Sequence, residues 1–380
     1  MIVRIYNKSY NLTNFAEIHK GGSEFIERAS KMIDATPLFE SYHVNSEAIL
    51  SSISHLEYNE PFYTFKRDGF YMTTKQRVNA YIRDNTILIN KYQYMYDLFF
   101  WILCIMYYTF HLYFQFFSST FVICTLGPIQ GLLRPLLAGY GHNYMHNGSS
   151  KSIIFYVTGM SLNDWKWEHT HLHHVYTNTF LDVDWNAINI TLKKLPTYLR
   201  LPLMYIKLNL NIIITFLSDP LKNWTDLIGR IILIIEMYTF YFNPLLIATS
   251  MSISIIWFLW IDFSNHYLSD TPYMTTTNMD WGEAQFITSK DFWIVDYGFI
   301  DSILGIGLGF QRAHHLFPKM SHGTYFLINP IILQVAKEFK IKNISTPHLF
   351  MNAGPILRML HSYVRTYLHL YYNINVTQIN

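Results

Sequence analysis

Charged side chains are scarce in this sequence. Asp, Glu, Lys and Arg together make up 14% of the 380 residues, whereas Phe, Trp and Tyr reach 17%. Soluble domains usually carry about 25% charged residues, so this composition indicates that lipid is part of the solvent. The formal net charge is only +2 and the chain has no Lys/Arg tract, which argues against a nucleic-acid partner.

Cysteine is nearly absent. Cys104 and Cys124 are the two cysteines, and both lie in apolar runs. A disulfide framework is therefore not expected, and a reduced, cytosol-facing compartment fits better. The first twenty residues, MIVRIYNKSYNLTNFAEIHK, contain no apolar stretch of the kind found in signal peptides, so a cleaved signal peptide is not expected either.

Two long stretches, 99–133 and 230–260, contain almost no charged residues. The first is interrupted at the polar residues 118–120, and the second near Asn243-Pro244, with Glu236 as its internal acid. Each stretch suffices for two spans near the short end of the usual range of about 17–25 residues. We predict two helical hairpins, with spans at about 98–117, 119–140, 228–243 and 245–264. The alternative is that they are buried core helices of a soluble protein.

The distribution of basic residues predicts the orientation of these hairpins. Neither predicted turn contains Lys or Arg, whereas the region between the hairpins contains Arg134, Lys166, Lys193, Lys194, Arg200, Lys222 and Arg230. Because cytosolic loops are enriched in Lys and Arg, we expect both termini and the middle segment to lie in the cytosol.

The region before the hairpins has a different pattern. In residues 1–58, IVRIYNKSYNL alternates like a short β-hairpin, while EFIERASKMI and SEAILSSISHL are typical of short amphipathic helices. Residues 59–95 are aromatic and charged, and we expect a surface linker with one helix. The sequence thus predicts a mainly α protein with a small α+β domain at its N-terminus.

Nine of the 17 histidines fall into four short stretches, each close to a predicted span on its cytosolic side. These histidines are His142 and His146, then His169, His171, His173 and His174, then His266, and finally His314 and His315, with Gln311 one helical turn before them. The spacing of i and i+4 puts two rings on one helix face, where they can share a metal. Imidazole near a bilayer is costly and usually functional, and helices that continue beyond the membrane would bring the four stretches together.

The number of imidazoles indicates which metal is expected. Seven or eight are too many for one zinc ion, which takes about four ligands, but they suit two iron ions. Cysteines do not accompany them and carboxylates are few. Taken singly, each stretch is also compatible with histidines that are merely hydrogen-bonded.

The histidine motifs resemble those of a known family. HNYMH, HTHLHHVYTN and FQRAHHLFPKMSH are similar, in order and spacing, to the three histidine boxes of membrane fatty-acid desaturases. Gln311 stands where the first histidine of the third box is expected, which resembles the front-end desaturases, as do DWGEAQF and GIGLGFQ. Asn143 replaces a common Asp in the first box, and the second box has HxxxHH spacing where HxxHH is usual.

This resemblance covers about residues 90–355 and implies a desaturase domain at 96–380, with four transmembrane helices and a cytosolic helical cap. It also implies that two iron ions are bound by His142, His146, His169, His173, His174, His266, Gln311, His314 and His315. His171 is a further candidate ligand, and we expect it to be the spare. Trp167 and Glu168 are expected to pack or hydrogen-bond around the ligands.

The N-terminal region resembles a second family. YNLTNFAEIHKGGSEFIERASKMIDATPLFESYH is similar to a cytochrome b5 domain, and the match implies that His19 and His43 are the axial ligands of haem b. Bis-histidine ligation suits electron transfer, because it leaves no open position on the iron. Lys20 stands where the family's HPGG turn has proline, and the domain starts almost at its first strand.

Together the resemblances imply a front-end fatty acyl desaturase in the endoplasmic reticulum membrane. The reaction would remove two hydrogens from adjacent methylenes of an acyl chain carried by coenzyme A or phospholipid, with O2 as oxidant. Cytochrome b5 reductase would supply electrons from NADH through the haem. Residues 155–160 and 293–299 are the candidates to line an acyl tunnel. A sphingoid-base desaturase or a lipid hydroxylase with the same iron chemistry stays open, as does a homologue without activity.

Overall fold

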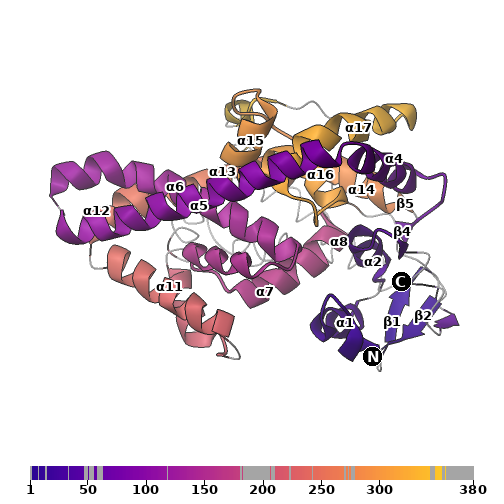
Figure 1. The fold of residues 1–380 in the computed structure, drawn as a ribbon, viewed down its shortest axis with the longest axis horizontal. Coiled ribbons are helices and arrows are strands. Elements are labelled where there is room, and N and C mark those ends of the chain that lie inside the picture. Colours follow the sequence, from indigo (N-terminus) through magenta and orange to yellow (C-terminus); the bar gives the residue numbers. More distant parts are fainter. Residues whose placement is uncertain are drawn as a thin grey trace, which may run out of the picture.

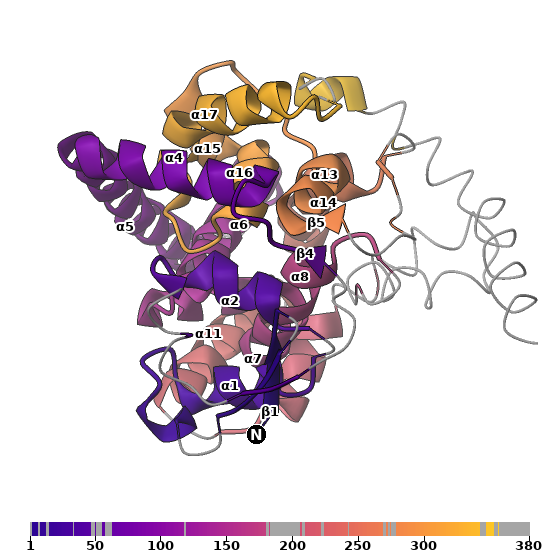
Figure 2. The ribbon, with the colours of Figure 1, turned by 90° about the vertical axis from the view of Figure 1, so that its right-hand side faces the viewer.

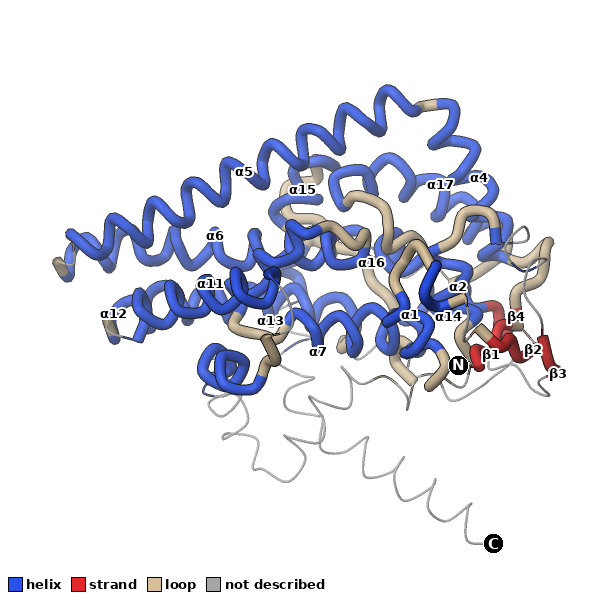
Figure 3. Tube along the Cα trace, turned by 60° about the horizontal axis from the view of Figure 1, so that its bottom comes forward, coloured by secondary structure: helices blue, strands red, loops and turns tan. Residues whose placement is uncertain are grey.

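The computed structural model describes residues 2–352 and residue 356, apart from 7, 13–14, 33, 47–49, 51–54, 58–62, 118, 180–181, 183–205, 207–209, 222–223, 242, 269–270, 273, 275–278 and 343–346. The described chain is mainly helical, and its strands gather at one end, near the N-terminus (Figure 3). Most of the helix predicted over 46–56 lies outside the described residues, and its last two residues belong to a strand.

The N-terminal domain is built on a small antiparallel sheet. Strands β1 (Ile2–Ile5) and β2 (Lys8–Asn11) form the predicted hairpin, with Val3 opposite Tyr10, and β3 (His55–Glu57) pairs with the other edge of β2. Helices α1 (Ser23–Ala29) and α2 (Thr36–Tyr42) complete the domain. Alternate residues of β1, such as Val3 and Ile5, are buried beneath these helices, as the period of two in the sequence predicts.

The N-terminal domain shares a hydrophobic core with the cap of the larger domain. Strand β4 (Tyr63–Thr64) pairs in parallel with β5 (Met279–Asp280), and α4 (Phe70–Asp84) packs on α17 (Tyr325–Glu338). The common core joins Ile5 and Leu38 to Trp281 and Ile332. In Figure 2 the layers lie one above another, with α1 below, then α2, then α4 and α16 (Gln311–Leu316), and α17 on top.

The first hairpin consists of two long apolar helices, α5 (Thr86–Phe116) and α6 (Thr120–His146). Helix α5 has 31 residues, which at 1.5 Å per residue is about 46 Å, compared with about 30 Å of bilayer hydrocarbon. It therefore extends well beyond the membrane, which explains why it begins at Thr86 although its apolar run starts near residue 98. Helix α6 likewise continues past residue 140 to His146, and so carries the first histidine box.

The second hairpin contains α11 (Trp224–Tyr241) and a long helix that returns through α12 (Pro244–Leu246), a π-helical turn η4 (Ile247–Met251) and α13 (Ser252–His266). Among the described residues, three helices are long and apolar enough to cross a membrane, namely Thr86–Phe116, Thr120–His146 and Pro244–His266. Helix α11 covers most of the predicted span 228–243 but carries Asp226, Arg230 and Glu236, so the fourth span stays a prediction.

A buried polar cluster connects three helices of this bundle. The carboxylate of Glu236 on α11 accepts a hydrogen bond of 2.8 Å from the Tyr107 hydroxyl on α5, and lies 3.5 Å from Nε of Arg134 on α6. Nε2 of His111 lies 3.2 Å from the same carboxylate, and the amide of Gln130 lies 3.0 Å from the other ring nitrogen of His111. All five side chains are almost fully buried, so each charge inside the bundle has a partner, as the cost of burying charge requires.

The cap lies at one end of the elongated molecule (Figure 1). After α6 it contains η2 (Ser150–Thr158), α7 (Leu162–Trp167), the π-helical segment η3 (Glu168–His173) and α8 (His174–Tyr176). After α13 it contains α14 (Trp281–Thr288), α15 (Gly298–Leu304), η5 (Leu308–Phe310), α16, η6 (His322–Thr324), α17 and η7 (Leu349–Asn352). The turn after α5 and the short α12 lie at the opposite end in Figure 1, so the histidine boxes gather at one end of the bundle.

Candidate metal centre

The end of α6 presents the first two histidines to the centre of the cap. Close packing around two glycines holds this end in place, because a Cβ on Gly139 would lie 2.5 Å from the carbonyl of Ile306 and one on Gly141 would lie 2.7 Å from the backbone of Phe155. His142 and His146 are one turn apart on the same face, and Nε2 of one ring lies 3.0 Å from Nε2 of the other. The HxxxH spacing therefore puts both rings on one helix face, as predicted from the sequence.

The second box lies in the π-helical segment η3 and the first turn of α8. A π-helix has one more residue per hydrogen-bonded turn than an α-helix, so His169 and His174, five residues apart, can face the same point. Nε2 of His174 lies 3.1 Å from Nε2 of His169. The ring of Trp165 stacks on His169, with ring centres 5.1 Å apart and an angle of 8° between the planes.

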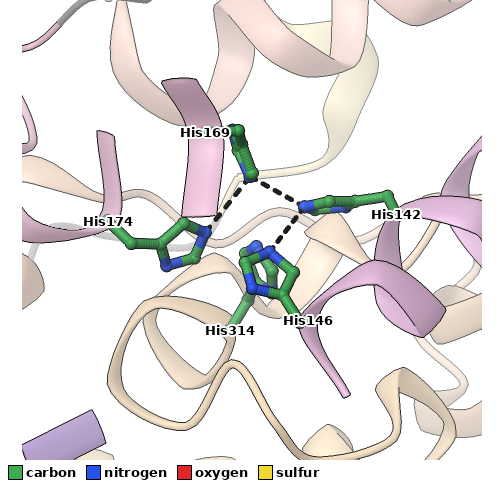
Figure 4. A group of neighbouring side chains, drawn as sticks. All are labelled: His142, His146, His169, His174 and His314. Atoms are coloured by element: carbon green, nitrogen blue, oxygen red, sulfur yellow. Dashed lines mark hydrogen bonds between the residues drawn. The ribbon is translucent and has the colours of Figure 1, made fainter. Parts of the chain in front are cut away.

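Five buried histidines form the first metal-ligating group, shown in Figure 4: His142, His146, His169, His174 and His314. One ring nitrogen of each lies within 4.8 Å of the corresponding nitrogen of every other. The closest pair is Nε2 of His142 and Nε2 of His169, at 2.7 Å. Imidazole nitrogens that converge in this way, with no carboxylate or thiolate among them, suit a borderline transition metal ion.

The second metal-ligating group lies beside the first and consists of His173, His266 and His315, again within 4.8 Å of one another. Gln311 belongs to the same place, because its side-chain amide lies 2.7 Å from Nε2 of His266 and 3.0 Å from Nε2 of His315. Rotation of a side-chain amide by half a turn exchanges its oxygen and its nitrogen. Gln311 can therefore turn its carbonyl oxygen toward a metal. The structure thus brings all nine predicted ligands together in two groups.

Hydrogen bonds fix the outward-facing nitrogens of the second group. Nδ1 of His173 lies 3.1 Å from both carboxylate oxygens of Asp182, and Nδ1 of His315 lies 2.8 Å from the Gln285 carbonyl oxygen. Nδ1 of His266 lies 3.1 Å from the backbone oxygen of Thr288. A metal-bound imidazole donates its second N–H to such an acceptor, which fixes its orientation and increases its basicity.

The first group is supported in the same way by two tyrosines. The hydroxyl of Tyr42, at the end of α2 in the N-terminal domain, lies 2.6 Å from Nδ1 of His146, and the Tyr325 hydroxyl lies 3.4 Å from Nδ1 of His314. None of these supporting residues, Tyr42, Tyr325, Asp182 and Gln285, was predicted from the sequence. Gln285 lies in the DWGEAQF motif and Asp182 eight residues after the second box, but nothing in the sequence relates Tyr42 to the first box.

Burial keeps these histidines in the form that binds metal. It lowers the pKa of His169, His314 and His315 well below the usual value, and neighbouring imidazoles lower each pKa further. A metal ion needs the neutral imidazole, so the ligands are available at neutral pH without losing a proton. The donor types, their convergence and their supported outer nitrogens therefore fit two metal ions.

Two other histidines near the groups have different surroundings. His171, the predicted spare, belongs to neither group: its Nδ1 lies 2.9 Å from the backbone oxygen of Lys166, and its ring lies 4.6 Å from the ring of Phe25 on α1. Trp167 packs on His171, at 5.3 Å between ring centres, so it is Trp165 that touches a metal-ligating histidine. His322 is fully buried, and its ring centre lies 5.1 Å from that of His314. No role was predicted for it from the sequence.

The two predicted haem ligands face each other in the N-terminal domain. The ring centres of His19 and His43 lie 6.1 Å apart. Two metal–nitrogen bonds of about 2 Å, together with about 1.1 Å from each bonded nitrogen to its ring centre, give about 6 Å. Nδ1 of His19 lies 3.0 Å from the Gly22 oxygen and Nδ1 of His43 lies 2.8 Å from the Phe39 oxygen, so both Nε2 atoms are left for a metal. The turn after His19 needs glycine, because Gly22 has φ of 96°. Lys20 has therefore not disrupted the turn.

A cavity lies in the bundle close to the metal-ligating groups. It has a volume of about 40 Å³, opens to the outside, and is lined by Arg134, Pro135, Ala138, Thr158, Met160, Ser254, Ile255 and Phe258. Ala138 is one turn before His142 on α6, and Phe258 is two turns before His266 on α13. Thr158 and Met160 belong to the predicted lining segment 155–160, whereas no residue of 293–299 lines this cavity.

The fold and the site define a class of protein: an integral membrane metalloprotein with two buried histidine groups at one end of its helical bundle. The family model for fatty acid desaturases matches residues 119–346, which include every histidine of both groups. The chain belongs to the fatty acid desaturase family, and it is an oxidoreductase.

Comparison with characterised proteins agrees with this assignment over most of the chain. The chain is 25% identical to acyl-lipid (8-3)-desaturase B of Dictyostelium discoideum, over 88% of its own length and 85% of the relative's. It is 26% identical to an acyl-lipid (8-3)-desaturase of Physcomitrium patens, over 90% and 84%, and 23% identical to a cytochrome b5-related protein of Drosophila melanogaster, over 89% and 83%. No solved structure matches the chain.

Proposed function

We propose that this protein is a front-end fatty acyl desaturase, which introduces a cis double bond between an existing double bond and the carboxyl end of an acyl chain. The two buried histidine groups carry the proposal, because eight imidazoles and one amide at the end of a membrane bundle fit a di-iron centre. When bound, two iron ions would activate O2 for the removal of hydrogen from an unactivated C–H bond.

The chain supplies the ligands and their support. In this proposal the five histidines of the first metal-ligating group hold one iron, and His173, His266 and His315 with Gln311 hold the other. Asp182 and Gln285 keep the outer nitrogens of His173 and His315 hydrogen-bonded, so that their inner nitrogens point at the metal. Burial of all these ligands excludes water, which protects a reactive centre from side reactions.

The cavity between α6 and α13 is the proposed place for the acyl chain. Its apolar lining, including Pro135, Ala138, Ile255 and Phe258, suits methylene groups, and it lies one to two helical turns from histidines of both groups. Arg134 lies at the part of the lining furthest from His142 along α6. Its guanidinium would be an unfavourable neighbour for a hydrocarbon tail, so it is suited to limit how far the chain enters.

The front-end assignment rests on Gln311 and on the relatives. Gln311 occupies the position where other desaturases have a third-box histidine, and the structure places its amide among the second group. Two of the relatives are named (8-3)-desaturases. In the same proposal His19 and His43 hold haem b, cytochrome b5 reductase passes electrons from NADH to it, and the protein resides in the endoplasmic reticulum membrane with both termini in the cytosol.

Yeast that expresses the chain provides the test. Cells are fed a panel of di- and tri-unsaturated fatty acids, and their lipids are analysed by gas chromatography–mass spectrometry, with His315→Ala as the inactive control. A new double bond on the carboxyl side of an existing one, absent in the variant, supports the proposal. If the membrane-inserted, iron-loaded protein makes no such product but alters sphingoid bases or adds a hydroxyl group, the alternative substrates take its place.

A further inference from the structure

One hydrogen bond joins the N-terminal domain directly to the metal centre. The Tyr42 hydroxyl lies 2.6 Å from Nδ1 of His146, and the two ring centres are 6.4 Å apart with 29° between the ring planes. Nε2 of His146 faces the first metal-ligating group, 3.0 Å from Nε2 of His142. With Nε2 bound to metal, Nδ1 carries the proton, so His146 donates this hydrogen bond and the tyrosine oxygen accepts it.

The next residue along the chain is His43, the proposed haem ligand. His43 follows the last residue of α2, and its ring packs against Phe39 at 4.7 Å as well as facing His19. Consecutive Cα atoms are about 3.8 Å apart, so one peptide unit, one tyrosine side chain and one hydrogen bond separate His43 from His146. Electronic coupling falls steeply with each gap through space, and this route contains a single gap, closed by a hydrogen bond.

Helix α2 is held firmly in the position that makes this contact. Glu40 forms an ion pair of 2.7 Å with Lys75 on α4, and both side chains are buried. The Tyr71 hydroxyl donates a 3.2 Å hydrogen bond to the backbone oxygen of Glu40. At the other end of the helix, Tyr176 on α8 donates a 3.0 Å hydrogen bond to the backbone oxygen of Asp34. The contact of Tyr176 comes from the cap that carries the second and third boxes, and those of Tyr71 and Lys75 come from α4, so the Tyr42–His146 contact is part of a built interface.

We propose that Tyr42 is a positioning residue that couples the haem on His43 to the metal centre, by holding His146 and bridging the two domains. This inference rests on the proposed function. With both groups bound, each transfer would take one electron from the haem iron, oxidised from ferrous to ferric, and would reduce one iron of the metal centre from ferric to ferrous. NADH, through the reductase, restores the haem. Tyr42 is neither oxidised nor deprotonated, and no covalent bond forms or breaks.

The experiment measures electron transfer inside the full-length protein, loaded with haem and iron and reconstituted in lipid nanodiscs. A laser flash with a deazaflavin photoreductant reduces the haem without O2, and its visible absorption reports how fast the electron leaves. Tyr42→Phe keeps the ring and removes the hydroxyl, and Tyr42→Leu removes both. Tyr6→Phe is the matched control, because it removes a hydroxyl that is bonded to Glu40 within the N-terminal domain and does not touch a metal ligand.

We expect Tyr42→Phe and Tyr42→Leu to slow haem reoxidation by about tenfold, the low end of the loss of activity that follows removal of an outer partner of a metal ligand. The hydrogen bond that closes the gap is lost, while all five histidines of the first metal-ligating group stay in place. Iron per chain, measured by mass spectrometry of the metal, and haem per chain, measured by absorbance, stay at the wild-type values. Tyr6→Phe reoxidises at the wild-type rate. Equal rates in Tyr42→Phe and wild type overturn the bridge, and so does loss of iron from Tyr42→Phe, since Tyr42 would then only hold a ligand. A wild-type protein that binds iron but no haem overturns the haem assignment together with the bridge.

Discussion

Asp182 offers a sharp test of the metal centre, because it supports one ligand without reaching the metal itself. Both of its carboxylate oxygens lie 3.1 Å from Nδ1 of His173, and one also accepts a 2.8 Å hydrogen bond from the backbone of Asn178. The carboxylate fixes the His173 ring and draws its proton outward. Asp182→Ala removes both effects, while the three other members of the second group stay in place.

The expected loss follows from what such partners contribute elsewhere. Mutation of an outer partner of a metal-bound histidine costs about 10–100-fold in affinity, which is about 1.4–2.8 kcal/mol for that metal. The first metal-ligating group does not include His173. Asp182→Ala should therefore lower iron from two per chain toward one when the protein is dialysed against a moderate chelator, and Asp182→Asn, which retains one acceptor oxygen, should lose less.

Iron per chain after dialysis is measured by inductively coupled plasma mass spectrometry and plotted against chelator concentration. Asp84→Ala serves as control, since it makes the same substitution at an exposed carboxylate at the end of α4, which pairs with Arg83. The reasoning is refuted if Asp182→Ala retains both irons at the chelator concentrations that wild type tolerates, or if it loses both irons together.

Three further predictions concern the bundle, the domain interface and pH. Glu236→Leu leaves the Arg134 charge buried without its partner and should lower the free energy of unfolding by about 3–5 kcal/mol. The double variant Arg134→Leu/Glu236→Leu should be more stable than Glu236→Leu, measured as the fraction of protein that stays monodisperse in detergent after heating. A double variant less stable than either single variant would contradict this. His171→Phe should keep full iron content, because the ring faces Phe25 and not the metal groups, whereas an iron content near that of His169→Ala would make it a ligand. Burial raises the pKa of Asp34 to about 6 from 3.8, so the folded protein loses stability as the pH rises from about 4 to about 6, where the unfolded chain is already ionised. Asp34→Asn should be about 2–3 kcal/mol more stable than wild type at pH 7.5, and the difference should shrink as the pH falls toward 4. A difference in melting temperature that is constant from pH 4 to 7.5 would show that Asp34 does not titrate in this range.

Helix positions and the grouping of the histidines were predictable because they depend on local spacing. Apolar runs without charge predict helices wherever they occur, and α5, α6 and α13 lie where such runs are found. The limits of the runs do not give the limits of the helices, because a helix can continue beyond its apolar run, as α5 does from Thr86 onward. The membrane character of α11 could not be settled in this way, since Glu236 is neutralised by residues on two other helices.

The supporting residues were not predictable for a different reason. Tyr42 and His146 are 104 positions apart and belong to separate domains, so only the docking of α2 against the cap brings them together. The same holds for Phe25 and His171. In the sequence, nothing distinguishes such an aromatic residue of the N-terminal domain from any other aromatic residue. Its importance comes from the partner that the tertiary structure gives it.

The π-helical segment Glu168–His173 has a consequence for how this chain is compared with others. A π turn is the way in which a helix accommodates one inserted residue without shifting what lies on either side. The second box here is one residue longer than HxxHH, yet His169, His173 and His174 still reach their groups. The longer spacing in this box thus coincides with a local change of winding. Such a box therefore preserves the positions of its ligands in space, and the number of residues between its histidines can differ. A sequence search that requires one fixed spacing would miss chains that build the same centre.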